Sequence, residues 1–170
     1  LAVEKAPKNG IAWARLAELC LSLEMQDAAL EAARKASELS PNLAPAQTVF
    51  GYAHLAQLKT FKAQKAFERA IELDSAAPLP RLGLGLAVIH QGRLDEGRGH
   101  IEIAAGLDPG NALIRSYLAK AYFDEKRDAV AARQLDIAKE LDPSDPTPWF
   151  YDALRKQTLN RPVEALQDIQ

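Results

Sequence analysis

The chain has 170 residues, of which 48% are hydrophobic and 26% are charged, and its formal net charge is -2 at pH 7. Its 21 basic and 23 acidic side chains are interspersed, so it lacks the basic stripe expected of a protein that binds a nucleic-acid backbone. The longest apolar runs fall far short of the roughly 20 residues that a membrane span requires, which argues against direct membrane insertion.

A residue that ends a helix-forming run, proline in all places but one, recurs every 34 residues along the chain. Proline stands at positions 7, 41, 109 and 143, and Ser75 fills the missing place. The run before it reads AIELDS up to residue 75 and AKELDP up to residue 143. A fixed period of this length is typical of arrays of two-helix units, which stack side by side and offer an extended concave surface.

Numbering each unit so that this closing residue is position 32 divides the chain into consecutive segments. The segments are the tail of an earlier unit at 1–9, four complete units at 10–43, 44–77, 78–111 and 112–145, and a partial unit at 146–170. Each complete unit is expected to form two helices. Positions 4, 7, 8 and 11 share one face of the first helix, and positions 20, 24 and 27 share one face of the second.

Alanine and glycine occupy whole columns of this register. Position 8 is Ala17, Gly51, Gly85, Ala119 and Ala153; position 20 is Ala29, Ala63, Gly97, Ala131 and Ala165; position 27 is Ala2, Ala36, Ala70, Ala104 and Ala138. Small side chains let two helices approach closely, so these columns predict tight helix crossings. Overpacking such a site with Ala29→Leu or Ala131→Leu is expected to destabilise the fold by about 1–3 kcal/mol.

With these residues the chain resembles the tetratricopeptide repeat family. The family pattern is matched in the first unit by Trp13, Leu16, Ala17, Cys20, Ala29, Ala33, Ala36 and Pro41, and in the fourth by Leu118, Ala119, Tyr122, Ala131, Leu135, Ala138 and Pro143. The resemblance implies an all-α, right-handed solenoid of antiparallel helix pairs, and an internal fragment of a longer array. Asp152 and Lys156 depart from the pattern at normally apolar positions, so we expect the first helix of the fifth unit to be rotated or to face solvent more.

No residue set in the sequence predicts catalysis, a cofactor or a metal site. His54, His90 and His100 are separated in the register, and no pair has the three- or four-residue spacing that places two ligands on one helix face. Cys20 is the single cysteine, and we interpret it as a buried apolar side chain. Seven of the nine glycines lie in unit 78–111, which we therefore expect to be the least rigid.

In the family, the first helices line a concave groove, into which positions 2, 5, 6, 9, 12 and 13 point. Carried over to this chain, the candidate binding residues are Arg15, Glu18, Tyr52, Leu82, Leu86, His90, Tyr117, Lys120, Phe150 and Tyr151. The charged clamp with which one family variant grips a terminal carboxylate is absent from both possible windows of three units. We expect a ligand with apolar anchors, although leucines at these positions could instead pack against a neighbouring helix of the array.

The sequence therefore predicts a non-catalytic module that binds a peptide or helix segment in a largely apolar groove. Two alternatives stay open. One is an accessory, substrate-recruiting arm of a larger catalytic or membrane-anchored protein; the other is a self-association module whose uncapped ends stack into homo-oligomers. The expected partner is a protein or peptide, not a nucleic acid or a membrane. A chain without a disulfide is compatible with the bacterial cytoplasm and periplasm alike.

Overall fold

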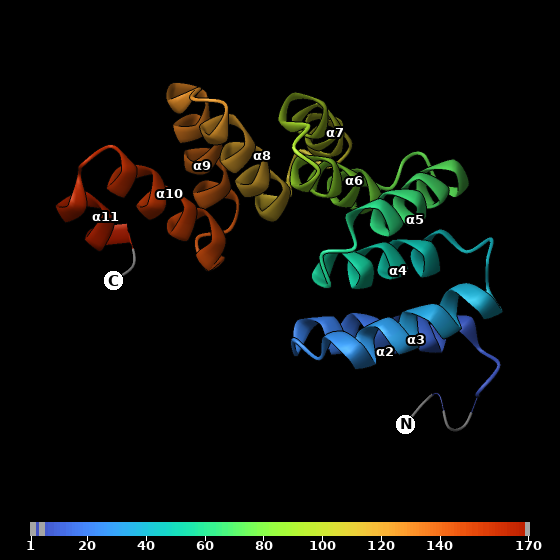
Figure 1. Cartoon of the computed structure of the whole chain (residues 1–170). Helices are drawn as coiled ribbons and strands as arrows, with labels where there is room; N and C mark the ends of the chain where they lie inside the picture. The colour runs from blue at the N-terminus through green and yellow to red at the C-terminus, as the bar shows by residue number, and fades with distance from the viewer. Residues whose placement is uncertain (1–2, 4–5, 169–170) are drawn as a thin grey trace. The chain divides into compact units, whose positions relative to one another are not determined.

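In the computed structural model, which describes residue 3 and residues 6–168, the described residues form helices and turns and no strand. The helices are α2 Gly10–Ser22, α3 Gln26–Leu39, α4 Ala44–Ala56, α5 Thr60–Leu73, α6 Pro78–His90, α7 Leu94–Leu107, α8 Ala112–Asp124, α9 Asp128–Leu141, α10 Pro146–Thr158 and α11 Pro162–Asp168 (Figure 1). Helix starts recur every 34 residues, both among the first and among the second helices of the pairs. Ala2 of the position 27 column and the ends of both partial repeats (1–2, 4–5 and 169–170) lie outside the described residues.

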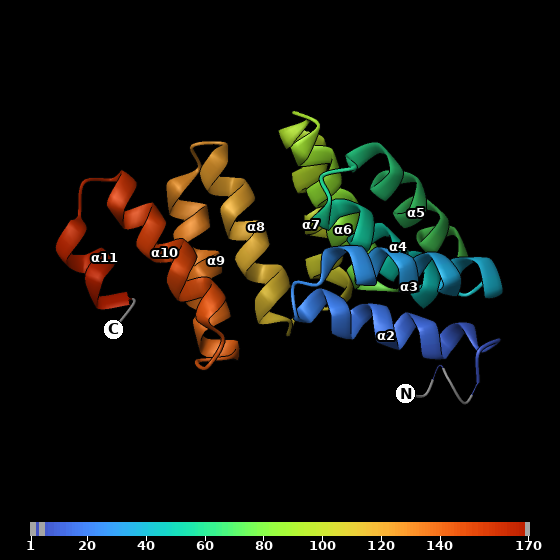
Figure 2. The same ribbon diagram turned by 60° about the horizontal axis from the view of Figure 1, so that its bottom comes forward.

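The chain divides into two compact units, Leu1–Arg93 and Leu94–Gln170. In the first unit, α2 packs on α3, α4 packs on α5, and α6 packs on both α4 and α5. In the second unit, α7 packs on α8, α8 packs on α9, and α10 packs on α8, α9 and α11 (Figure 2). The repeat expected at 78–111 thus contributes α6 to the first unit and α7 to the second.

Side chains just before the first helices fix where these helices begin. The Asn9 side chain accepts hydrogen bonds from the backbone N–H groups of residues 11 and 12, and Asn111 and Asp145 cap α8 and α10 in the same manner. Proline near the start of α4, α6 and α10 suits a helix N-terminus, where its missing N–H leaves no bond unmade. These local signals place the helix starts in register with the repeat.

A left-handed residue ends the first helix of every pair. The residues with positive φ are Glu24, Leu58, Gly92, Lys126 and Asn160, which are spaced by 34 residues. Such a residue commonly ends a helix because it turns the chain sharply. Only one of the five is glycine, so the other four adopt a conformation that disfavours a side chain.

The predicted alanine columns lie at the helix crossings. Ala29, Ala63 and Ala131 at position 20 have no exposed surface, and neither do Ala36, Ala70, Ala104 and Ala138 at position 27. At position 8, Ala17 is buried in a cluster that joins α2, α3 and α4. The prediction that these columns face the helix packing is confirmed for the described residues.

Phe67 of α5 fills the space that two glycines leave open. A Cβ atom added at Gly51 of α4 would lie 2.6 Å from Phe67 Cε1, and one added at Gly83 of α6 would lie 2.3 Å from Phe67 Cζ. The ring itself is fully buried. Gly83, one of the seven glycines from which the sequence predicts a less rigid unit at 78–111, therefore has a packing role.

In four repeats the side chain at position 4 donates a hydrogen bond to the backbone carbonyl of the preceding closing proline. The donors are the indoles of Trp13 and Trp149, the amide of Gln47 and the guanidinium of Arg115, and the acceptors are Pro7, Pro143, Pro41 and Pro109, respectively, at 2.9–3.3 Å. Three chemically different side chains make the same contact. The bond ties the start of each of these first helices to the turn that precedes it.

Of the two alternatives expected for the first helix of the fifth unit, rotation or greater exposure to solvent, exposure is wrong at Asp152. Asp152 is only 3% exposed, because it accepts hydrogen bonds from Lys139 Nζ at 2.6 Å and Arg155 Nε at 2.8 Å and pairs with Lys156 Nζ at 3.1 Å. Lys156 also pairs with Asp168 of α11 at 2.7 Å. Burial acts to raise the pKa of Asp152, but these cationic donors outweigh it and hold the pKa below its usual value.

Candidate functional site

The candidate binding residues of α2 and α4 are engaged within the protein. Arg15 and Glu18 form an exposed ion pair at 2.6 Å, one turn apart on α2. The Tyr52 hydroxyl donates to the backbone carbonyl of Leu79 at 2.8 Å, and its ring packs edge-on against Phe67 with centroids 4.9 Å apart. Tyr52 therefore braces α4 against the start of α6.

The three candidates on α6 differ in their exposure. Leu82 is 2% exposed, so its assignment to an open groove is corrected: it belongs to the buried side of the helix. The physical reason is that α6 is apolar around most of its circumference, and such a helix is buried on more than one face. Leu86 is half-buried, and His90 is exposed at the end of the helix.

In the second unit, the structure brings the four remaining candidates together on α8 and α10. The rings of Tyr117 and Tyr151 meet edge-on with centroids 5.8 Å apart, and Phe150 lies beside Tyr151 at 5.7 Å. Lys120 pairs with Asp124 one turn along α8 at 2.6 Å. Burial is the main reason that the pKa of Tyr151 is raised, so its hydroxyl stays protonated at neutral pH.

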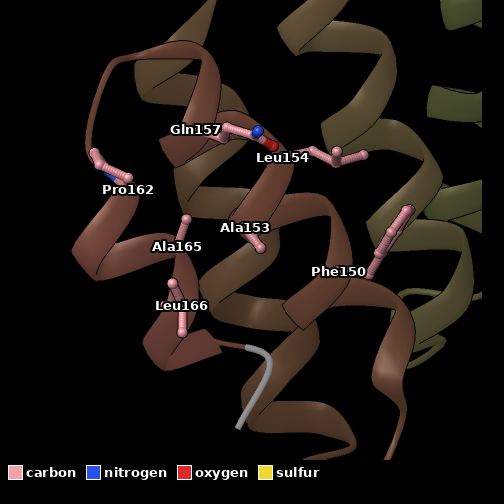
Figure 3. Close-up of a pocket in the computed structure, with 7 residues that line it drawn as sticks. All are labelled: Phe150, Ala153, Leu154, Gln157, Pro162, Ala165 and Leu166. Carbon is pink, nitrogen blue, oxygen red and sulfur yellow. The ribbon is translucent and has the colours of Figure 1, made fainter.

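Two hollows flank α10. The first, of about 210 Å³, lies against α8 and is called the α8–α10 groove; its lining includes Lys120, Phe123, Tyr151 and Leu154. The second, of about 300 Å³, lies against α11 and is called the α10–α11 hollow. Figure 3 shows Pro162, Ala165 and Leu166 of α11 on one side of it, and Phe150, Ala153, Leu154 and Gln157 of α10 on the other.

The α10–α11 hollow is almost wholly apolar, and part of its lining is open to solvent. Phe150 is 54% exposed and Leu166 is 55% exposed, whereas most large apolar side chains of a folded domain are covered. Leu154 lines both hollows, so the apolar surface continues across α10. Such a surface can take up an apolar side chain of another segment.

Some residues of these hollows were not selected from the sequence. Leu154 occupies position 9 of its repeat, the same groove position as Lys120, and the register would have identified it if the partial repeat had been read as far as that position. The residues Pro162 and Leu166 belong to a second helix and had no such signal. In the first unit, Lys59 just before α5 and Lys62 and Lys65 within it recur every three residues and form a basic row that the repeat register does not indicate.

Among the side chains that the structure describes, no group of three or more His, Cys, Asp or Glu residues could hold a metal ion. Within residues 6–168, none of the helices combines the length and the apolar character needed to cross a membrane.

Comparison with known proteins identifies the repeat. The family model described as tetratricopeptide repeat matches residues 48–112 and 91–146. Anaphase-promoting complex subunit 3 of Schizosaccharomyces pombe is 28% identical over 151 residues, which cover 88% of this chain and 20% of that protein. The chain thus spans about a fifth of the length of this curated relative.

Solved structures agree in fold. The Cut9 and Hcn1 hetero-tetramer of the APC/C contains a chain with a TM-score of 0.85 and 18% identity, over 98% of this chain and 34% of that one. YrrB, a TPR protein with an unusual peptide-binding site, matches with a TM-score of 0.62 and 19% sequence identity, over 98% of this chain and 86% of its own. At this identity the likeness shows the fold alone, and it confirms the predicted all-α solenoid of helix pairs.

Proposed function

Because the chain belongs to the tetratricopeptide repeat family, we propose that it is a non-catalytic protein-interaction module that binds a helical or extended segment through apolar anchors. The module would comprise complete repeats at 10–43, 44–77, 78–111 and 112–145, with partial repeats on both sides. Because the relative is named as a subunit of a complex, a place within a multiprotein assembly fits this proposal.

The observation that carries the proposal is the exposed aromatic and aliphatic surface of α10. Phe150 and Leu154 are partly open to solvent, and the edge-on pair of Tyr117 and Tyr151 borders them. Aromatic side chains on rigid helices are the usual anchors of binding energy at protein interfaces. Lys120 at the rim would favour a ligand with an acceptor group near its apolar anchor. Arg15, Glu18, Leu86 and His90 would extend the surface along the other first helices.

The proposal can be tested with a labelled amphipathic peptide that carries Leu and Phe on one helix face. Fluorescence anisotropy is expected to give a dissociation constant of about 1–10 μM, or about -7 to -8 kcal/mol. Phe150→Ala removes an exposed anchor without opening the core, and it should weaken binding about tenfold or more. Tyr117→Ala should weaken it as well.

Phe61→Ala is the matched control, because Phe61 is an exposed phenylalanine on α5, far along the chain from α10. This variant should bind the peptide as the parent does. Equal affinities of the Phe150→Ala and Phe61→Ala variants would contradict the proposal, provided that circular dichroism finds both folded.

Self-association is the second candidate, favoured by the open apolar surface of α11. Val163 and Leu166 are exposed on α11, and Leu166 also lines the α10–α11 hollow, so two copies would bury these side chains against each other. Light scattering across a concentration series would detect it. A Leu166→Glu variant should then stay monomeric at concentrations where the parent associates, and a parent that is monomeric throughout would exclude this candidate.

A further inference from the structure

A third hollow lies in the first unit, between α3 and α5. Its volume is about 580 Å³, within the range of roughly 300–1,000 Å³ that is usual for ligand sites. Both helices pack on α4, which lies between them in Figure 1 and supplies the floor. The floor residues of α4, at 47, 50 and 54, lie on another face of the helix than the candidate groove residue Tyr52.

Positive charge gathers around this hollow, which we call the α3–α5 basic hollow. Its cationic lining residues are Arg34, Lys59, Lys62 and Lys65, and none of the described side chains that line it is a carboxylate. Arg34 is paired with Glu38 at 2.8 Å, and Lys59 donates to an amide oxygen at 2.6 Å. Lys62 and Lys65 form no ion pair within the part of the chain that the structure describes. In a chain with a net charge of -2, the three lysines, which have no carboxylate partner among the described residues, attract an anionic group.

The floor of the basic hollow is apolar. Leu30 of α3 and Phe50 of α4 line it, together with Ala66 of α5. Both Leu30 and Phe50 are only partly buried, although they pack against the core of the first unit. An inorganic anion would leave this floor uncovered, whereas an anionic group attached to an apolar side chain would cover it.

His54 adds a buried polar atom that has no hydrogen-bond partner among the described residues. Its side chain lines the hollow and is 7% exposed, and its Nδ1 atom is buried without a hydrogen bond among the described residues. The equivalent residues of the neighbouring repeats, Cys20 and Val88, need no such bond. Burial, with added repulsion from Lys62 and Lys59, lowers the pKa of His54, so the ring is neutral at pH 7. A neutral imidazole can both donate and accept a hydrogen bond.

We propose that the α3–α5 basic hollow binds an acidic protein segment that carries one bulky apolar side chain among Asp or Glu residues. The carboxylates would pair with Lys62 and Lys65, which have no acidic partner of their own, and the apolar side chain would cover Leu30 and Phe50. Because this site uses helices other than α8 and α10, failure of either binding proposal would leave the other unaffected.

Fluorescence anisotropy with three labelled hexapeptides tests the proposal on the intact chain. The first peptide is Glu-Glu-Asp-Phe-Glu-Glu, the second has every acid replaced by its amide, and the third has Ser in place of Phe. We expect the first to bind at about 10 μM and the other two about tenfold more weakly or worse. Raising the salt concentration from about 50 to about 300 mM should weaken the binding of the first peptide, because salt screens exposed charges.

A charge-matched pair of variants locates the binding. Lys62→Gln with Lys65→Gln should weaken binding of the first peptide about tenfold or more. Lys8→Gln with Arg133→Gln removes the same charge from exposed positions outside the hollow and should leave the affinity within about twofold of the parent. All four side chains are exposed, so the fold should persist, and Lys62→Glu alone provides a second test if the double variant fails to fold.

Three outcomes would overturn the proposal. Equal losses in the two double variants would mean that net charge alone governs binding. Equal binding of the amide peptide would remove the role of the carboxylates. A single-stranded oligonucleotide that binds as tightly as the first peptide, with the same dependence on Lys62 and Lys65, would make the hollow a general polyanion site rather than a site for an acidic segment.

Discussion

Replacing Gly83 with alanine tests whether the Phe67 ring fixes the packing of α6 on α5. The new Cβ would lie 2.3 Å from Phe67 Cζ, whereas non-bonded carbon atoms rest about 3.5–4.0 Å apart. The ring has little room to retreat, because it also abuts Gly51 and meets Tyr52 edge-on at 4.9 Å. Overpacking costs about 1–3 kcal/mol, and alanine regains about 0.5–1 kcal/mol of helix propensity, so the net loss should be about 0–2.5 kcal/mol.

Urea denaturation followed by far-ultraviolet circular dichroism measures this loss. Gly106→Ala in α7 is the control, because a Cβ there would meet no atom within 4 Å and should stabilise the chain by about 0.5–1 kcal/mol. In a Phe67→Leu background the Gly83→Ala change should lose most of its cost. If Gly83→Ala and Gly106→Ala both raised the unfolding midpoint, the packing role assigned to Gly83 would be refuted.

Three further changes test other parts of the fold. Asp152→Asn should cost about 1–3 kcal/mol, because the cations around Asp152 lose a charged acceptor but keep their pairs with Asp128 and Asp168. The pKa of Asp152 is depressed in the folded state, so the Asp152 carboxylate stabilises the fold above its ordinary pKa of about 4. This stabilisation is lost as the pH falls through the folded-state pKa. The urea midpoint of the variant should therefore lack this part of the dependence on acid pH. Trp149→Phe should lose the bond to Pro143 and about 0.5–1.5 kcal/mol, measured by thermal melting. Ala131→Leu should lower the melting temperature by overpacking a fully buried site, and an unchanged melting temperature would contradict the column assignment.

The sequence was sufficient for the fold because one signal is repeated many times. Each alanine at position 20 or 27 is weak evidence alone, but Ala29, Ala63 and Ala131 recur at one spacing and all are fully buried. The left-handed turns could not be foreseen in the same way. Glu24 and Leu58 adopt positive φ without being glycine, because the packing of the two flanking helices overrides the local preference of these residues.

The site was predicted in part. Tyr117 and Tyr151 lie together as their register positions suggest, because both stand at position 6 of successive first helices, α8 and α10. Leu82 is not in an open groove, because a register position predicts where a side chain points but not whether a neighbouring helix buries it. The exposure expected at Asp152 fails for a related reason. A charged residue in an apolar column indicates exposure only if no oppositely charged side chain can pair with it. Lys139, which pairs with Asp152, lies on another helix and belongs to no local sequence pattern around Asp152.

The bond to the closing proline suggests what the tryptophan of the repeat pattern contributes. Trp13 and Gln47 differ in size and polarity, yet both deliver an N–H to a proline carbonyl at 2.9–3.0 Å. The position therefore requires a donor of sufficient reach rather than an aromatic ring. The repeat at 78–111 is the exception: Ser75 replaces the proline, and the Nε atom of Arg81 at position 4 is buried with no hydrogen bond to any described residue. Ser75→Pro makes this turn match those of the other repeats, and a rise of about 0.5–1.5 kcal/mol in unfolding free energy that disappears in an Arg81→Met background would establish that proline places the acceptor for Arg81.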